Sequence, residues 1–194
     1  MIGLTPLTFA MVGLMFALWG NGVQLLGGFP DREGTHGTGA TIGVAASLSG
    51  AIALLFDAIW FVAARPLGTD SAAIQAQLIF SAIAAMYGFL WLGAGIAQLR
   101  GWDLRPIGQL AALCFILQVF EILVIAVEFR PWSGDLTGIT IALALYLPVL
   151  AGFYLVTHGR TTPRWVGWSC MVAALGSGWL AFAPTGIAPF LQLS

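Results

Sequence analysis

Lysine is absent from this sequence of 194 residues, and its 7 basic residues are all arginine. Without a lysine amine the chain cannot carry a chromophore bound as a Schiff base. Charged residues make up only 8% of the composition, and the formal net charge is −1. Because no basic tract exists to neutralise phosphates, the sequence excludes a nucleic-acid-binding protein.

The sequence also lacks the short motifs that mark common enzyme sites. It contains no HExxH or CxxC pattern and no paired histidine ligands. Its 2 cysteines, Cys114 and Cys170, fall within apolar runs, where a free cysteine is usually a small apolar filler. We therefore expect no enzymatic activity, no catalytic residues, no metal and no cofactor.

What the sequence has in excess is apolar surface. Hydrophobic residues make up 59% of the chain, glycine contributes 25 residues, and the mean hydropathy is +0.94. A water-soluble domain of this length would not hide so much apolar surface. The composition predicts an integral membrane protein, with residues 1–194 forming a single membrane domain.

Six apolar runs are long enough to cross a hydrocarbon core of about 30 Å as helices. Each break between them contains proline, glycine or charge. The sequence thus predicts an all-α fold, a bundle of six transmembrane helices. The predicted spans are Leu4 to Phe29, Gly39 to Ala64, Ser71 to Leu99, Pro106 to Glu128, Asp135 to Thr157 and Trp165 to Ile187.

The arginines predict the orientation of the bundle. Cytoplasmic loops carry an excess of Lys and Arg. The arginines of this chain divide five against two between the odd-numbered and the even-numbered loops. The first, third and fifth loops hold Arg32, Arg100, Arg105, Arg160 and Arg164, and the other two hold Arg65 and Arg130. We therefore expect the odd-numbered loops in the cytoplasm and both termini outside it.

Three polar residues within the spans are candidates for function. Asp57 lies in the second span, and Gln118 and Glu121 lie three residues apart in the fourth. A carboxylate at membrane depth is costly unless it is protonated or paired, so such residues often mark a functional site. The three could form one intramembrane polar network. Alternatively, the two acids lie near the outer surface and hydrogen-bond neighbouring helices.

Aromatic residues deep inside the spans are a second candidate feature. Tyr87 and Trp91 lie one turn apart on one face of the third span, and Trp19 and Trp179 lie well inside the first and sixth. Large amphipathic rings usually sit at the membrane interface, so these need another explanation. They either enclose a slot one small molecule wide or serve helix packing.

The first span presents a continuous stripe. Met11, Leu14, Leu18 and Asn21 follow the three-and-four spacing of one helix face. Apolar side chains followed by an amide suit a constriction with a hydrogen-bonding station, although helix packing gives the same spacing. Pro148 adds a further possible station, because a proline inside the fifth span frees a carbonyl one turn earlier.

Two segments resemble a known family of channels. The frame Tyr87-Gly88-Phe89-Leu90-Trp91, followed by Gly101-Trp102-Asp103-Leu104-Arg105-Pro106, is similar to the third span and following turn of the urea and short-chain amide channels. Asn21-Gly22 resembles that family's pore asparagine. The resemblance implies a homohexamer of six-helix protomers in the bacterial inner membrane, each with its own pore. By matching position, Leu14, Leu18, Asn21, Tyr87 and Trp91 would line it.

These observations together predict a passive channel for urea or small neutral amides, with a small solute and membrane lipid as its partners. Such planar, strongly hydrated solutes need a passage that replaces water at a few hydrogen-bonding stations and offers ions no compensating charge. Two alternatives stay open at this stage. One is an acetate or monocarboxylate channel of similar hexameric architecture, and the other is a non-transporting subunit of a larger membrane complex.

Overall fold

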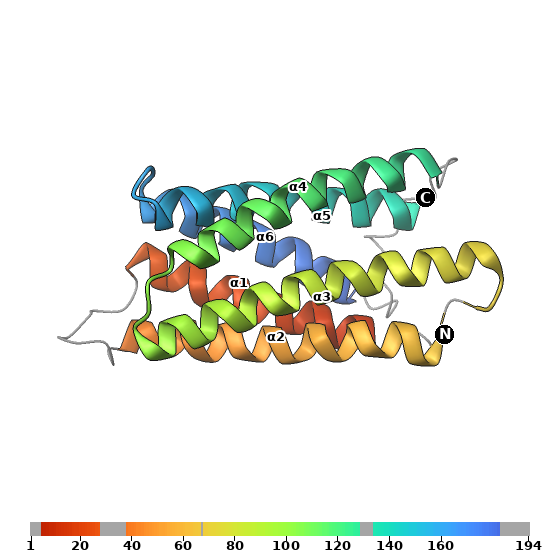
Figure 1. Cartoon of the computed structure of the whole chain (residues 1–194), viewed down its shortest axis with the longest axis horizontal. Helices are drawn as coiled ribbons and strands as arrows, with labels where there is room; N and C mark the ends of the chain where they lie inside the picture. The colour runs from red at the N-terminus through yellow and green to blue at the C-terminus, as the bar shows by residue number, and fades with distance from the viewer. Residues whose placement is uncertain (1–4, 28–37, 67, 129–133, 183–194) are drawn as a thin grey trace.

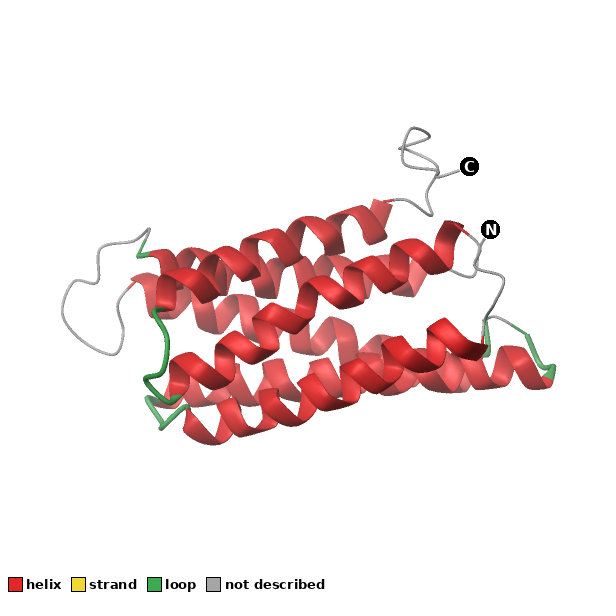
Figure 2. Cartoon of the chain, turned by 90° about the horizontal axis from the view of Figure 1, so that it is seen from above, coloured by secondary structure: helices red, strands yellow, loops and turns green. Residues whose placement is uncertain are grey.

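The computed structural model describes residues 5–27, 38–66, 68–128 and 134–182 of the chain. These residues form six α-helices and no strand. The helices run along the long axis of the molecule (Figures 1 and 2). In chain order they are α1 (Thr5–Leu26), α2 (Thr38–Ala64), α3 (Ser71–Arg100), α4 (Arg105–Glu128), α5 (Gly134–Thr157) and α6 (Pro163–Phe182).

The predicted helix boundaries are confirmed to within two residues wherever the structure describes them. Leu4, Phe29 and Ile187, at the outer limits of the first and sixth predicted spans, lie outside the described residues. The all-helical prediction therefore holds for the described chain. It holds because the apolar runs are long and the breaks between them are chemically distinct.

Short signals in the sequence explain where several helices begin and end. Asp70 caps α3, since its Oδ1 accepts a hydrogen bond from the backbone N–H of Ala73 at 2.9 Å. The same helix is closed by Gly101, whose φ of 64° lies in the left-handed region open to glycine. Gly27, with φ of 72°, follows the last residue of α1 in the same conformation.

The turn between α3 and α4 is fixed by Asp103 and Arg105. Arg105 donates its Nε–H to Asp103 Oδ2 at 2.7 Å and its backbone N–H to Oδ1 at 2.9 Å. The side-chain hydrogen bond from Arg105 holds the pKa of the Asp103 carboxyl below its usual value. Since both side chains are exposed, the pair sets the geometry of the turn more than it adds stability.

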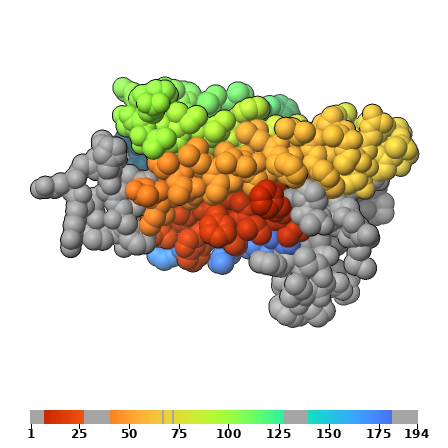
Figure 3. Space-filling view, turned by 90° about the horizontal axis from the view of Figure 1, so that it is seen from below, coloured from red at the N-terminus to blue at the C-terminus, as the bar shows by residue number. Residues whose placement is uncertain are grey.

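The six helices close into a ring. Going around it, the order is α3, α2, α1, α6, α5, α4, and each helix packs against its two neighbours in that order. Figure 3 shows α1 between α2 and α6 on one face. The ring closes between α4 and α3, where contact is sparsest. The order around the ring is therefore the order along the chain, with α6 lying beside α1.

Small residues bring α1 and α2 together closely. Gly13 lies against Ala53, Gly20 against Ala46, and Gly50 against Ala17. A Cβ built on Gly50 would stand 2.6 Å from the Ala17 Cβ and 2.9 Å from the Gly13 carbonyl oxygen. Only small side chains such as alanine fit opposite these glycines, so the two backbones approach each other in the manner of small-xxx-small pairs.

The outer surface of the ring is apolar. Five helices are long and apolar enough to cross a membrane, and α6 is not among them. Large hydrophobic side chains such as Phe16, Phe89 and Phe120 are more than half exposed on the outside. The architecture is that of a helical membrane protein. The lower hydropathy of α6 reflects its serine and glycine residues, several of which pack against α1 and α5.

The structure places the freed carbonyl near Pro148 away from the interior. α5 continues as a helix through Pro148, which has no N–H to donate to the carbonyl of Ala144. Both residues are exposed on the outer side of α5. The prediction that this carbonyl serves as a station inside the bundle is therefore wrong, because the sequence locates the proline along the helix but not around it.

We expect Gly50→Ala to destabilise the protein by about 1–3 kcal/mol, because the new methyl group meets backbone atoms that cannot move aside. Thermal unfolding of the purified protein in detergent measures this loss as a lower midpoint. Gly93→Ala is the matched control, since a Cβ there would meet only the terminal Cδ1 of Ile107, at 3.0 Å. Equal midpoints for the two variants would contradict the close α1 to α2 packing.

Candidate functional site

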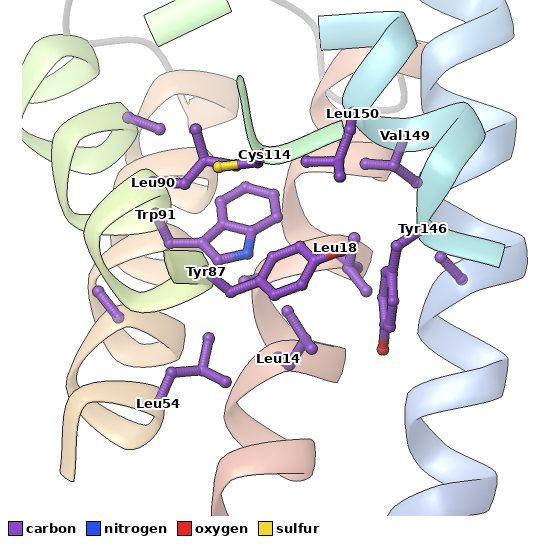
Figure 4. Packing of buried hydrophobic residues seen from close by; sticks show 14 of the residues in the cluster. Leu14, Leu18, Leu54, Tyr87, Leu90, Trp91, Cys114, Tyr146, Val149 and Leu150 are labelled. Carbon is purple, nitrogen blue, oxygen red and sulfur yellow. The ribbon is translucent and has the colours of Figure 1, made fainter. Parts of the chain in front are cut away.

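Aromatic and aliphatic side chains from several helices meet inside the ring. Tyr87 and Trp91 of α3, Leu14 and Leu18 of α1, and Tyr146 of α5 are all at most 3% exposed. In Figure 4, the Tyr87 ring lies between Trp91 and Tyr146, with both leucines close by. The Tyr87 and Tyr146 ring centroids are 5.3 Å apart. The structure thus brings together four of the five residues predicted as pore-lining in one cluster.

We call the end of the ring where α1, α3 and α5 finish the odd-loop end. A second aromatic contact extends the cluster toward this end. Trp91 meets Phe153 of α5 edge to face, with ring centroids 5.5 Å apart and an interplanar angle of 84°. This is the favourable T-shaped arrangement. Trp91 therefore connects the two halves of the ring across its centre.

The tyrosine hydroxyls in the cluster are both paired. Tyr87 donates to Gln118 Oε1 on α4 at 2.9 Å, which links the two helices whose contact is sparsest. Tyr146 pairs with Ser177 of α6, whose own hydroxyl donates to the carbonyl of Ala173 at 3.0 Å. Both bonds cross between neighbouring helices and fix the orientation of the two rings.

Five buried polar atoms, by contrast, make no hydrogen bond within the part of the chain that the structure describes. Two are donors and three are acceptors. A buried polar atom left unsatisfied costs about 1–3 kcal/mol, and native proteins pair most of them. Such a set favours a polar partner from outside the chain. The atoms are Trp91 Nε1, Gln118 Nε2, Gln98 Oε1, Asp57 Oδ1 and Glu121 Oε2.

These unpaired atoms lie at different depths along the axis of the ring. Gln98 lies near the odd-loop end of α3, and Trp91 lies seven residues earlier in the same helix. Tyr87, which contacts Gln118, lies four residues earlier still, about 16 Å from Gln98 at 1.5 Å per residue. Donors and acceptors therefore occur at several depths rather than at one.

Asp57 and Glu121 lie toward the opposite end of the ring. Each is seven residues from the end of its helix, α2 or α4. Glu121 shares a helix face with Gln118, as predicted from their spacing. No hydrogen bond joins Asp57 to Gln118 or Glu121 among the described residues, and Gln118 pairs with Tyr87 instead. The structure thus separates the predicted three-residue network into two parts.

Asn21, the fifth residue predicted to line a pore, joins three helices. Its Nδ2 donates to the carbonyl of Ala17 at 2.8 Å and to Ser47 Oγ of α2 at 2.9 Å. Its Oδ1 accepts from Gln98 Nε2 of α3 at 3.1 Å. The amide of Asn21 is therefore occupied by the protein, and the hydrogen-bonding capacity left at this level belongs to Gln98.

Sequence reasoning missed Gln98, although a signal for it was present. Gln98 follows Tyr87, Trp91 and Ala94 at the spacing of one helix face. Trp19 shows the opposite error. It is 48% exposed and faces away from the cluster, so the prediction that it encloses a slot with Trp91 is wrong. One residue along a helix turns the side chain by about 100°, and Trp19 is the neighbour of inward-facing Leu18.

The interior offers no arrangement suited to a metal. Across the described ranges, no three His, Cys, Asp or Glu side chains gather where they could hold a metal ion. Cys114 and Cys170 are free and buried. The interactions that the structure shows inside the ring are hydrogen bonds and aromatic contacts.

Comparison with known proteins adds no relative to this description. No protein-family model, curated protein or solved structure matches the chain.

We expect Tyr87→Phe to lower the free energy of unfolding by about 1–3 kcal/mol, because it leaves the fully buried Gln118 amide without its only protein partner among the described residues. Thermal unfolding in detergent measures the change. The double variant Tyr87→Phe with Gln118→Leu should lose less, since it removes both polar partners. Tyr154→Phe is the control, because that hydroxyl makes no hydrogen bond within the described chain. A double variant less stable than Tyr87→Phe would contradict the pairing.

Proposed function

We propose that this protein is a passive channel for urea or small neutral amides, with the solute passing inside the helix ring beside the aromatic cluster. One observation carries the proposal: the N–H groups of Trp91 and Gln118 have no acceptor in the described chain, although both are buried inside the bundle. A solute carbonyl is the acceptor that they would serve. The unpaired oxygens of Gln98 and Glu121 would serve its N–H groups.

The aromatic cluster suits a flat solute. The rings of Tyr87, Trp91 and Tyr146 provide apolar faces beside the unpaired donors. Urea and primary amides are planar, so such faces would flank them without holding them tightly. Leu14 and Leu18 complete an apolar wall that gives a hydrated ion nothing to exchange for its water.

The charges of the ring favour a neutral solute over a carboxylate. Asp57 and Glu121 are acidic, and every arginine in the described helices lies at a helix end. An anion passing through would therefore meet two acidic side chains and no compensating cation. This argues against the alternative of an acetate channel.

The surroundings of the channel follow from the sequence. The excess of arginine in the odd-numbered loops supports a cytoplasmic position for these loops and a position outside the cytoplasm for both termini. The resemblance to urea and amide channels favours a homohexamer in a bacterial inner membrane. The apolar outer faces of the helices suit contact with lipid and with other copies of the chain.

Solute flux into proteoliposomes tests the proposal. We expect urea and acetamide to enter faster than they enter empty vesicles, and Trp91→Phe to reduce that flux about five- to tenfold, because it removes one hydrogen-bond donor. Trp19→Phe makes the same chemical change on the exposed surface and should leave flux unchanged. Flux in the wild type equal to the empty-vesicle leak would overturn the proposal.

Acetamide and acetate separate the two channel hypotheses, because they differ little in size but differ in charge. At neutral pH, after subtraction of the empty-vesicle leak, we expect acetamide flux to exceed acetate flux by at least about tenfold. In Asp57→Asn with Glu121→Gln, acetamide flux should persist, since the amides retain polar groups at both positions. Faster acetate than acetamide in the wild type would favour the monocarboxylate channel.

A further inference from the structure

Three helices bring amide side chains together at the odd-loop end of the ring. Gln24 lies two residues before the end of α1, and Gln98 lies two residues before the end of α3. Between them is Gly43, in the second turn of α2. We call Gln24, Gly43 and Gln98 the amide cradle.

The orientation of the Gln98 amide is fixed by a chain of hydrogen bonds. A backbone carbonyl can only accept, so the group of Asn21 bonded to the Ala17 carbonyl must be its NH₂. Asn21 therefore presents its oxygen to Gln98, and Gln98 must donate with its own NH₂. The other end of the Gln98 amide is consequently a carbonyl oxygen, and this oxygen is buried and unpaired in the described chain.

Gly43 shows where that oxygen points. A Cβ built on Gly43 would overlap both Gln98 Oε1 and Gln24 Oε1, and it would stand 2.8 Å from Gln24 Cδ. The two side-chain oxygens therefore converge on the space that a larger residue would fill at this position. Two negative dipole ends therefore lie side by side against the Gly43 backbone, and since Gln24 is only partly buried, they lie at the edge of the bundle.

Two converging carbonyl oxygens match an NH₂ group, which carries two N–H donors on one nitrogen. A bare metal cation suits them less well, since replacing its hydration shell requires a ring of oxygens. We propose that the amide cradle binds the NH₂ group of a neutral primary amide or urea. This inference depends on the proposed function only for the identity of the solute, and it assigns the odd-loop mouth of the pathway to Gln24, Gly43 and Gln98.

The sequence provides a local probe of this site. Gly3, Gly43 and Gly108 are the only glycines that follow an isoleucine. Protein labelled with ¹⁵N-glycine and ¹³C-carbonyl isoleucine therefore gives three selected backbone signals in detergent. We expect acetamide to shift the Gly43 signal in a saturable manner and to leave the Gly108 signal nearly unmoved. N,N-dimethylacetamide, which has no N–H, should not saturate it.

Variants locate the binding in the cradle. Gln98→Met removes the buried acceptor and should weaken acetamide affinity, read at Gly43, by about fivefold. Gln24→Met should weaken it to a similar degree and leaves the Asn21 hydrogen bonds intact. If Gln98→Met disturbs folding, the Gly108 signal will move, and the test of the proposal then rests on Gln24→Met alone. Unchanged affinity in Gln24→Met would overturn the proposal.

Flux measurements separate this inference from the channel proposal. Gly43→Ala should lower urea flux, because its methyl group displaces both oxygens. Gly178→Ala should not, because its methyl group would face Met15, midway along α1 and away from the cradle. A saturable Gly43 shift without any wild-type flux would support the cradle and overturn the channel. Flux without a saturable shift, or an equal response to N,N-dimethylacetamide, would overturn the cradle and leave the channel.

Discussion

A polar atom buried inside an apolar helix bundle has no bulk water to pair with, and this constraint organises the interior of the protein. Hydrogen bonds within each helix pair most of its backbone N–H and C=O groups, so the buried polar atoms that still need partners belong to a few side chains. Asn21, Ser47, Tyr146 and Ser177 meet it by bonding across helix boundaries. Gln118 meets it only in part and Trp91 does not meet it, since the Gln118 NH₂ group and the single N–H of Trp91 have no partner in the described chain. Under the proposed function, that difference separates polar groups that are fully paired within the bundle from polar groups that a solute would pair.

The walls of the ring differ in how closely they are packed. Between α1 and α2, glycines such as Gly13 and Gly50 let the backbones approach until only small side chains such as alanine fit opposite them. Between α3 and α4 contact is sparse, and the hydrogen bond from Tyr87 to Gln118 is the polar link. A closely packed wall and a loosely packed one give the interior cluster a fixed side, formed by Leu14 and Leu18, and a second side with sparser contact. Such an arrangement suits a passage that must fit a solute without binding it strongly.

Much of the candidate site could be predicted from spacing along single helices. The i, i+4 pairs Leu14 with Leu18 and Tyr87 with Trp91 each lie on one face, and the structure buries all four residues in one cluster. Trp19 was misassigned because depth along a span does not reveal the direction around it. Gln98 was missed because it lies close to a helix end, where glutamine is usually exposed. Its role depends on Asn21, which is 77 residues away in the sequence.

The sequence by itself determined the class of protein and the positions of its six helices, because long apolar runs and the breaks between them are local properties. It also indicated which residues share a face of each helix, since helical periodicity fixes this. Only the tertiary structure decided the order of helices around the ring, which brings α1 beside α6 and α3 beside α4. That order determines which polar atoms find partners, because every bond between helices depends on relative rotation and depth. The spacing of residues along one helix gives neither the rotation nor the depth of that helix relative to its neighbours.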